Sequence, residues 1–359
     1  MQPGELRRIA RAISTIENQA AGYEALLEKA YRQPRWADVV GVTGPPGVGK
    51  STLVDALVAH WAAAGEAIAV LAIDPSSPYS GGAVLGDRVR RTRSSGLDNT
   101  YFRSLSSRGH VGGLTDTATD LVAVLSLFGF RRVIIETVGA GQSDVEVHET
   151  ADCTVVVTVP GLGDGIQASK AGLMEIGDVF VVNKADLPGA EETARMVERA
   201  LAAAYMGAPG INRHAKRVRA PPPSQTLSPG VAAMQRRHGN VACDETTWVP
   251  PVLRTVASGN EHVGVLAGAI DDFIAWSDGA GRRALRTRDR AYAQIVRALT
   301  TLLLAPYVRA PGSITIPTPL ARWVDDVVAG LTSPIEAAHT LISEKPPAPW
   351  PPMDTQRDG

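Results

Sequence analysis

Cysteine is scarce in this chain, and its two residues, Cys153 and Cys243, lie far apart and outside any C-x-x-C pattern. They carry no disulfide or zinc signature. The histidines, such as His60, His110 and His148, are scattered and show no metal-ligand spacing. The sequence therefore gives no support to a redox protein or to a Cys/His metal centre.

Excess charge and long apolar runs are also lacking. The 359 residues include 36 Lys and Arg against 37 Asp and Glu, a net charge of −1, and 44 % are hydrophobic. Balanced charge argues against a general binder of nucleic acid or anionic membranes. No apolar run approaches the roughly 20 residues of a membrane span, and the N-terminal residues lack an apolar signal core. We expect a cytoplasmic protein with a sizeable core that binds neither nucleic acid nor membranes.

What the chain does contain is a phosphate-loop pattern, G-x-x-x-x-G-K-[ST], at residues 44–51. Its glycines let the backbone curl so that successive N–H groups face phosphate oxygens. Lys50 is predicted to place a positive charge beside the β- and γ-phosphates, and the Ser51 hydroxyl to ligate Mg²⁺. The nucleotide-binding residues predicted in this loop are Gly44, Pro45, Pro46, Gly47, Val48, Gly49, Lys50, Ser51 and Thr52.

The flanks of the loop support this interpretation. The apolar run at residues 36–42 is typical of a buried strand, and Leu53, Leu57 and Trp61 follow at helical spacing. Strand, glycine loop and helix together place the phosphates at a helix N-terminus, which favours anions. The sequence predicts a protein that binds a nucleoside triphosphate.

A second motif, N-K-x-D at residues 183–186, follows another apolar run. The Asp186 carboxylate can accept hydrogen bonds from the N1–H and the 2-amino group of guanine. Adenine offers no such pair and would leave a buried carboxylate unsatisfied. The Lys184 stem can lie along the purine, and Asn183 can brace the loop. Alone this motif is usually an ordinary loop, but downstream of a phosphate loop it predicts guanine recognition.

A third motif lies between these two, where the apolar run at residues 132–135 ends in Glu136, with Gly139 three residues on. A carboxylate here faces Mg²⁺ directly or through water, and the Gly139 N–H can meet the γ-phosphate. An acid that caps the next helix is the alternative for Glu136. Gln142 is a candidate for orienting the attacking water, and its place three residues past Gly139 leaves that assignment open.

Two further acids are candidates for sensing the Mg²⁺–phosphate group. Asp74 ends the apolar run at residues 69–73, at the edge of a parallel sheet where ligands gather. Asp87 lies in the glycine-rich segment 81–88, which is suited to movement. For both, a position without ligand contact is the alternative. The predicted catalytic residues are Lys50, Asp74, Asp87, Glu136 and Gln142, and the predicted metal ligands are Ser51, Asp74, Asp87 and Glu136.

The pattern along the chain predicts an α/β fold with a mostly parallel sheet, because apolar runs alternate with amphipathic stretches. The clearest strands are Val39–Val42, Ala67–Ile73, Arg132–Ile135, Cys153–Val159 and Asp178–Val182. Before them, an apolar stripe predicts one helix over residues 5–30. It is formed by Leu6, Ile9, Ile13 and Ile16.

The expected domain organisation follows from shifts in composition. The chain divides into an N-terminal helical extension (1–37), a nucleotide-binding domain (38–275) with a flexible insertion (207–247), a C-terminal helical segment (276–345) and a disordered tail (346–359).

Together these motifs resemble the MeaB/ArgK family of P-loop GTPases, chaperones of methylmalonyl-CoA mutase and similar adenosylcobalamin-dependent mutases. The run 163–176 is the most family-specific, and in the family it is an additional switch segment that responds to nucleotide and mutase. Departures are a longer insertion, arginine in place of lysine in the loop 86–90, and the run 255–258, which reads T-V-A-S where S-A is usual. The resembling stretches are residues 44–53, 72–77, 81–88, 135–143, 161–177 and 181–186.

The resemblance implies a P-loop fold of the SIMIBI type, Mg²⁺ as cofactor, and GTP and GDP as substrate and product. It also implies that hydrolysis is a timer that gates cobalamin loading into an acyl-CoA mutase, or the removal of damaged cofactor. A cobalamin adenosyltransferase is a further candidate partner. Ala257 is the candidate that completes the guanine pocket, and the C-terminal helices are the candidate contact of a homodimer.

Two other functions stay open on the sequence. A protein kinase of the amino-acid transport (LAO/AO) type would need a general base near its acceptor, and the sequence identifies none. A GTP-dependent metallochaperone would generally carry Cys/His clusters, and this sequence contains none.

Overall fold

The computed structural model describes residues 3–33, 35–74, 97–106, 113–137, 143–161, 171–207, 248–304, 318–329 and 331–344. The chain divides into two compact units, Met1–Arg290 and Ala291–Gly359, and the division falls within helix α11 (Arg282–Leu304). The expected domain boundaries at residues 37, 275 and 345 stay predictions. Residues 208–247 of the expected insertion and the expected tail lie outside the described residues.

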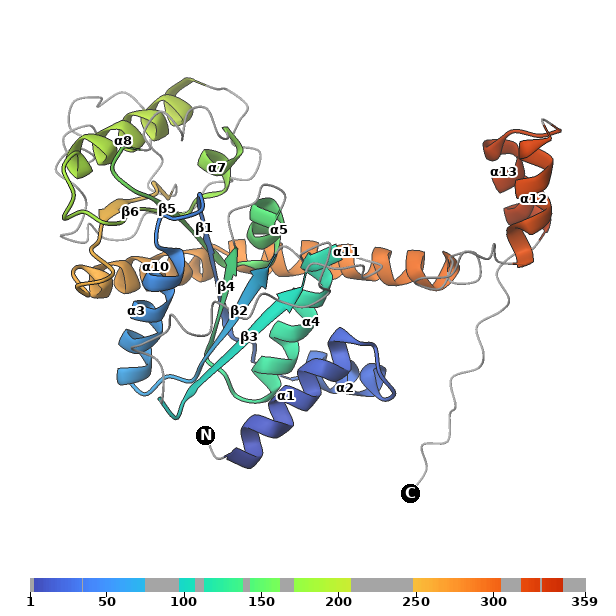
Figure 1. Ribbon diagram of the computed structural model, residues 1–359, viewed down its shortest axis with the longest axis horizontal. Coiled ribbons are helices and arrows are strands. Elements are labelled where there is room, and N and C mark those ends of the chain that lie inside the picture. The colour runs from blue at the N-terminus through green and yellow to red at the C-terminus, as the bar shows by residue number, and fades with distance from the viewer. Residues whose placement is uncertain are drawn as a thin grey trace. The chain divides into compact units, whose positions relative to one another are not determined.

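Unit 1 is built on a seven-stranded sheet with the order β3-β2-β4-β1-β5-β6-β7 (Figure 1). Every pair of neighbouring strands in it is parallel. The predicted α/β fold with a mostly parallel sheet is therefore confirmed. The strands are β1 (Asp38–Thr43), β2 (Ile68–Asp74), β3 (Thr100–Ser106), β4 (Arg132–Thr137), β5 (Cys153–Thr158), β6 (Val179–Val182) and β7 (Val252–Arg254).

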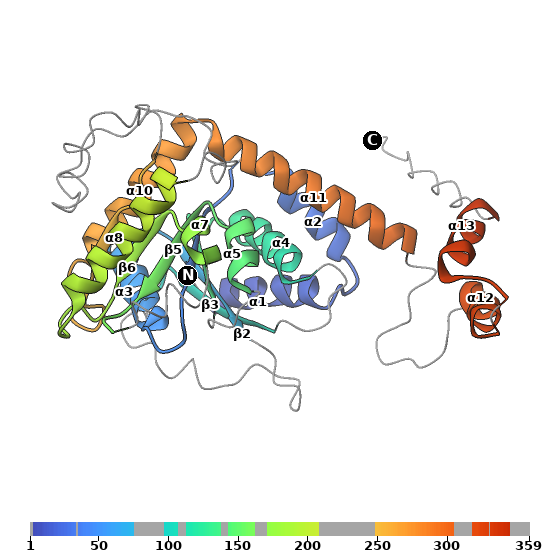
Figure 2. The same ribbon diagram turned by 90° about the horizontal axis from the view of Figure 1, so that it is seen from above.

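Helices cover both faces of this sheet (Figures 1 and 2). Successive side chains of a strand point to opposite faces, so Val40 packs in one cluster with Leu53 and Phe273, while Val39 packs in another with Leu121. The helices of unit 1 are α1 (Pro3–Glu17), α2 (Tyr23–Tyr31), α3 (Lys50–Ala63), α4 (Gly113–Leu127), α5 (Ser143–Thr150), α7 (Ala171–Ile176), α8 (Ala190–Gly207), α10 (Val263–Gly279) and the start of α11. Unit 2 holds the rest of α11 with α12 (Thr318–Val328) and α13 (Pro334–Glu344).

The N-terminal segment forms two helices, so the prediction of one helix over residues 5–30 is wrong. Gly22, directly before α2, has a left-handed φ of 89°, and Gln19 has a φ of 46°. These values end the first helix and turn the chain, because a left-handed residue cannot continue a right-handed helix. Most of the predicted apolar stripe does face the core, since Ile9, Ile13 and Ile16 are buried. Leu6, its first member, is exposed, so the stripe begins one helical turn later than predicted.

Three buried aspartates mark the starts of adjacent strands. Asp38 is the first residue of β1, and Asp152 and Asp178 directly precede β5 and β6. The Asp152 carboxylate accepts a hydrogen bond from the Val39 N–H at 3.0 Å, and the Asp178 carboxylate accepts one from the Thr154 N–H at 2.9 Å. These carboxylates therefore satisfy backbone donors at the edge of the sheet opposite the phosphate loop.

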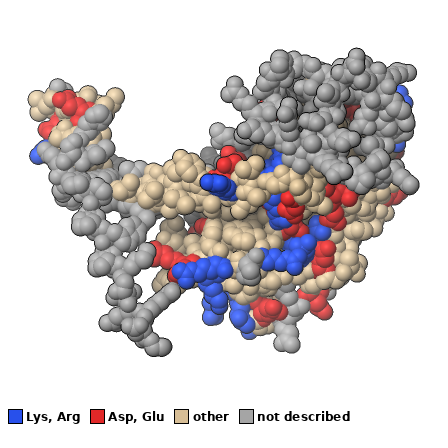
Figure 3. All heavy atoms as spheres, turned by 180° about the vertical axis from the view of Figure 1, so that it is seen from behind, with Lys and Arg blue, Asp and Glu red and all other residues tan. Residues whose placement is uncertain are grey.

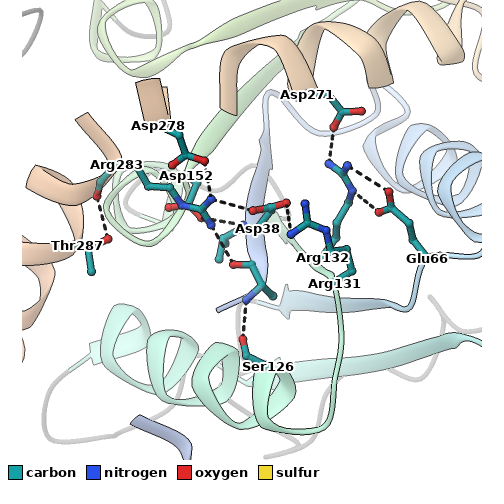
Figure 4. Close-up of polar contacts among 12 residues, drawn as sticks. Asp38, Glu66, Ser126, Arg131, Arg132, Asp152, Asp271, Asp278, Arg283 and Thr287 are labelled. Carbon is teal, nitrogen blue, oxygen red and sulfur yellow. Dashed lines mark hydrogen bonds and ion pairs between the residues drawn. The ribbon is translucent and has the colours of Figure 1, made fainter. Parts of the chain in front are cut away.

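Arginines of α11 neutralise these aspartates. Arg283 lies between Asp38 and Asp152, at N···O distances of 2.9 and 3.1 Å (Figure 4). A second arginine, Arg290, lies 3.1 Å (N···O) from Asp152. The remaining aspartate, Asp178, lies 3.5 Å (N···O) from Arg286. Spacings of three, four and seven residues place the three arginines on one helix face. We call this group the strand-start clasp; its members are Asp38, Asp152, Asp178, Arg283, Arg286 and Arg290.

Surface charge is mixed in sign. On the face seen in Figure 3, Lys and Arg side chains lie among Asp and Glu side chains, in keeping with the net charge of −1. In the part of the chain that the structure describes, no helix is both long and apolar enough to cross a membrane.

We expect Asp120→Asn to stabilise the protein at pH 8. Asp120 of α4 accepts a hydrogen bond from the Tyr31 hydroxyl at 2.7 Å, yet burial raises the pKa of its carboxyl from 3.8 to about 6. The folded state thus holds a proton that the unfolded chain releases, and stability falls as pH rises from about 4 to about 6. Asparagine should recover about 1 to 2 kcal/mol at pH 8, after a discount for partial exposure.

Urea denaturation at pH 8 and pH 4.5 measures this effect. The gain in the free energy of unfolding should be smaller at pH 4.5, because Asp120 is already protonated in the folded protein at that pH. Asp272→Asn, an exposed carboxylate on α10, is the matched control and should change stability little at either pH. An equal gain from Asp120→Asn at both pH values would contradict the explanation by burial.

Candidate nucleotide-binding site

The phosphate loop joins the central strand β1 to α3, at the carboxyl edge of the sheet. Gly44 and Gly49 have positive φ values of 142° and 89°. A Cβ at Gly44 would lie 2.1 Å from the Val157 carbonyl oxygen, and one at Gly49 would lie 2.6 Å from Asn183 Nδ2. Only glycine fits these two positions, because both the backbone angle and the neighbouring atoms exclude a side chain.

Lys50 begins α3, and its side chain is buried against the phosphate loop. The ammonium donates to the carbonyl oxygens of Gly44 at 2.8 Å and Pro45 at 2.9 Å. A compact positive charge is thus held beside the N–H groups of a helix N-terminus, and both favour an anion at this point. This geometry is compatible with the predicted role of Lys50 at the phosphates, which stays a prediction.

Ser51 and Glu136 meet beside the loop. The Ser51 hydroxyl donates to the Glu136 carboxylate, which is buried near the end of β4. Their meeting follows from the sheet order, since β4 is the neighbour of β1 and Glu136 lies opposite Val42. A hydroxyl and a carboxylate are the hard oxygen donors that suit Mg²⁺.

The two oxygen donors can be compared with the way proteins usually hold Mg²⁺. Among the described residues, no three or more His, Cys, Asp or Glu side chains form a group that could hold a metal ion by themselves. Mg²⁺ usually takes one or two carboxylates and completes its shell with water and substrate phosphates. The pair Ser51 and Glu136 is compatible with that mode of coordination.

The remaining predicted phosphate-side residues are placed only in part. Asp74 is the last residue of β2, and β2 lies beside β4. Its backbone therefore stands at the same edge of the sheet as the phosphate loop. Asp87, Gly139 and Gln142 lie outside the described residues, and so do residues 163–170 of the family-specific segment.

The N-K-x-D motif follows β6 and reaches back to the phosphate loop. The Asn183 side chain is buried, and its Nδ2 donates to the Val48 carbonyl oxygen at 2.9 Å. Lys184, with a φ of 55°, donates through Nζ to the Gly47 carbonyl oxygen at 3.0 Å. Asp186 is exposed two residues on. The structure thus brings the motif predicted to read guanine against the motif predicted to hold phosphates.

Ala257 belongs to the same arrangement. It is buried, and its N–H donates to Asn183 Oδ1 at 3.1 Å. Thr255, which the sequence reasoning did not single out, donates its hydroxyl to the same oxygen at 3.2 Å. The departure of the run 255–258 from the usual S-A pattern was the one sequence signal that pointed to this position.

Comparison with known proteins identifies the family of this chain. The family model described as methylmalonyl Co-A mutase-associated GTPase MeaB matches residues 9–311. A Pyrococcus abyssi protein named as a GTPase is 36 % identical over 310 residues, 86 % of this chain and 85 % of that protein. The mouse methylmalonic aciduria type A homolog, mitochondrial, is 39 % identical over 147 residues, 41 % of this chain and 35 % of that protein.

A solved structure agrees on the fold. The crystal structure of LAO/AO transport system kinase superimposes with a TM-score of 0.58 over 95 % of this chain and 96 % of that one, at 22 % identity. Because the sequence identity is this low, the structural similarity supports a shared fold and no shared function. The family match spans both the phosphate loop and the N-K-x-D motif, and the chain therefore belongs to the MeaB family of GTPases.

Proposed function

We propose that this protein is a guanine-specific, Mg²⁺-dependent GTP hydrolase that serves as a chaperone of an adenosylcobalamin-dependent acyl-CoA mutase. The observation that carries the proposal is the Asn183 side chain, which ties the N-K-x-D motif to the phosphate loop. One ligand that has both a purine and a triphosphate would span these two motifs. The family name supplies the link to methylmalonyl-CoA mutase.

Each residue has a separate task in the proposed reaction. Lys50 and the loop N–H groups stabilise the charge that develops on the β- and γ-phosphate oxygens. Ser51 and Glu136, with Asp74 and Asp87, would hold Mg²⁺, which when bound neutralises phosphate charge. Lys184 and Asp186, in the motif braced by Asn183, select guanine. Further proposed roles are the γ-phosphate contact of Gly139, the orientation of water by Gln142, and closure of the guanine pocket by Ala257.

The proposal that the protein acts on a mutase rests on its family. The family description names methylmalonyl-CoA mutase, and the mouse relative is named for methylmalonic aciduria. In the proposed cycle, bound GTP or GDP sets the switch loops, among them the segment 163–176, and these gate cofactor loading or removal. A cobalamin adenosyltransferase is a further proposed partner, and residues 276–345 are the proposed homodimer contact. The proposed setting is the cytoplasm.

The deciding experiment measures phosphate release from GTP with and without candidate adenosylcobalamin-dependent mutases, with ATP as the control nucleotide. We expect slow turnover that one mutase accelerates, and little release from ATP. Asp186→Asn should reduce the preference for GTP over ATP by about 10- to 100-fold, because a charged acceptor for guanine is lost. The substitution should leave the phosphate loop able to bind the triphosphate of either nucleotide.

The outcomes separate the alternatives. GTP hydrolysis that no mutase changes would overturn the chaperone role and leave a GTPase. Transfer of labelled γ-phosphate to a protein, in place of free phosphate, would favour a kinase. Stoichiometric bound metal other than Mg²⁺ in the purified protein would favour a metallochaperone.

A further inference from the structure

Thr255 stands directly after β7, and its side chain is fully buried. Its backbone is fixed independently of that side chain. The Thr255 N–H donates to the Val182 carbonyl oxygen at 3.0 Å, and the Thr255 carbonyl oxygen accepts from the Ala185 N–H at 3.0 Å. These two bonds join the ends of β6 and β7, so a change of side chain leaves the backbone anchored.

Within the part of the chain that the structure describes, the hydroxyl of Thr255 has a specific hydrogen-bond partner. It donates to Asn183 Oδ1 at 3.2 Å, beside the Ala257 N–H at 3.1 Å. The opposite end of the same amide donates through Nδ2 to the Val48 carbonyl oxygen at 2.9 Å. An amide oxygen accepts and an amide nitrogen donates, so a flipped Asn183 would set its NH₂ against two donors. The Thr255 hydroxyl therefore helps to fix which way this amide points.

We propose that Thr255 is a positioning residue for nucleotide binding. Its hydroxyl holds the Asn183 amide in the orientation that links the loop at Ala257 to the phosphate loop at Val48. The base end and the phosphate end of the site are thereby kept at a fixed separation before a ligand arrives, which lowers the cost of ordering both on binding. This inference rests on the proposed function, because it takes a guanine nucleotide as the ligand.

A buried threonine at the opposite edge of the sheet offers a direct contrast. Thr154, near the start of β5, is also fully buried, and its Oγ1 lies 3.1 Å from His148 Nδ1. It occupies the edge of the sheet opposite the phosphate loop. Valine matches the shape of threonine but lacks the hydroxyl, so the same substitution at the two positions separates a general packing effect from an effect on the nucleotide site.

The experiment compares Thr255→Val, Thr255→Ser and Thr154→Val in the full chain. GTP and GDP affinities are measured by titration calorimetry, and KM and kcat from phosphate release. Thr255→Val should weaken GTP and GDP binding by the same factor, about five- to tenfold, and should raise KM more than it lowers kcat. Thr255→Ser should return both affinities to within about twofold of the natural protein. Thr154→Val should bind both nucleotides normally, whatever stability it loses.

A double-mutant comparison makes the test independent of stability. In an Asn183→Ala background, Thr255→Val should cause no further loss of affinity, because the hydroxyl acts through the amide that has been removed. Thr255→Ala gives the same comparison if the valine variant does not fold.

Three results would overturn the inference: normal affinity in Thr255→Val, failure of Thr255→Ser to restore binding, or losses that add in the double variant. A natural protein that binds neither GTP nor GDP would instead overturn the proposed function.

Discussion

Replacing Lys50 by alanine is expected to weaken GTP binding by at least about 100-fold. The ammonium is buried at the phosphate loop, where two carbonyl oxygens hold it. In the nucleotide complex the same charge would meet β- and γ-phosphate oxygens, and charge-assisted hydrogen bonds each contribute about 1.5 to 3 kcal/mol. A loss of about 3 kcal/mol corresponds to roughly 100-fold in affinity. Titration with GTP and with GDP measures the effect.

Lys184→Ala is the matched control for this prediction. Lys184 also donates to a carbonyl oxygen of the phosphate loop, that of Gly47 at 3.0 Å, but its side chain is exposed. If lysines at this site act only by bracing the loop, the two variants should lose similar affinity. If Lys50 acts on the phosphates as proposed, its loss should exceed that of Lys184→Ala by about tenfold or more. Tight GTP binding by Lys50→Ala would contradict its assignment to the phosphates.

The phosphate loop and the N-K-x-D motif could be predicted because their chemistry is local. The glycines, Lys50 and Ser51 are adjacent in sequence, and their spacing already determines how the backbone can curl. The position of N-K-x-D after a short apolar run identified a strand end, and β6 does end at Val182. In parallel α/β sheets ligands gather at the carboxyl ends of strands, so the edge that carries the site followed from the motifs.

The contact between Ser51 and Glu136 could not be predicted from the sequence, because it depends on the order of the strands in the sheet. The sequence gives the order in which strands occur, but β4 lies between β1 and β2 in the sheet. Strand β3 was missed for a different reason. Its sequence, T-Y-F-R-S-L-S, has too few apolar residues for a buried run, because β3 is an edge strand with β2 as its one neighbour.

The strand-start clasp was not predicted, although the sequence holds a signal for it. An aspartate precedes or opens three separate apolar runs, at residues 38, 152 and 178. The three arginines fall on one face of α11, which a sequence reading alone assigns to solvent as a charged helix face. Only the fold shows that these two sets of charges meet, since more than 100 residues separate each arginine from its aspartate.

The clasp suggests a large effect on stability. Arg283→Met should lower the free energy of unfolding by about 2 to 4 kcal/mol, because removing one partner leaves buried carboxylates under-compensated. Burial of the Arg283 guanidinium acts to lower its pKa, but Asp152, Asp38 and Asp278 outweigh burial, so that its pKa is raised. The charges around it therefore favour the positively charged form. The loss of stability stays moderate because each carboxylate keeps another arginine. Asp38 still pairs with Arg131 at 3.3 Å. Asp152 still pairs with Arg290 at 3.1 Å.

Urea denaturation of Arg283→Met and two companion variants tests this account. Asp38→Asn in the Arg283→Met background should recover part of the loss, because it removes one of the carboxylates left under-compensated. Arg195→Met removes an arginine from the exposed pair with Glu191, whose side chains are 65 % and 61 % accessible. That variant should cost less than about 0.5 kcal/mol, since water screens an exposed pair. Equal losses in Arg283→Met and Arg195→Met would show that burial of the clasp adds nothing. A double variant no more stable than Arg283→Met would show that the uncompensated charge of Asp38 is not the cause.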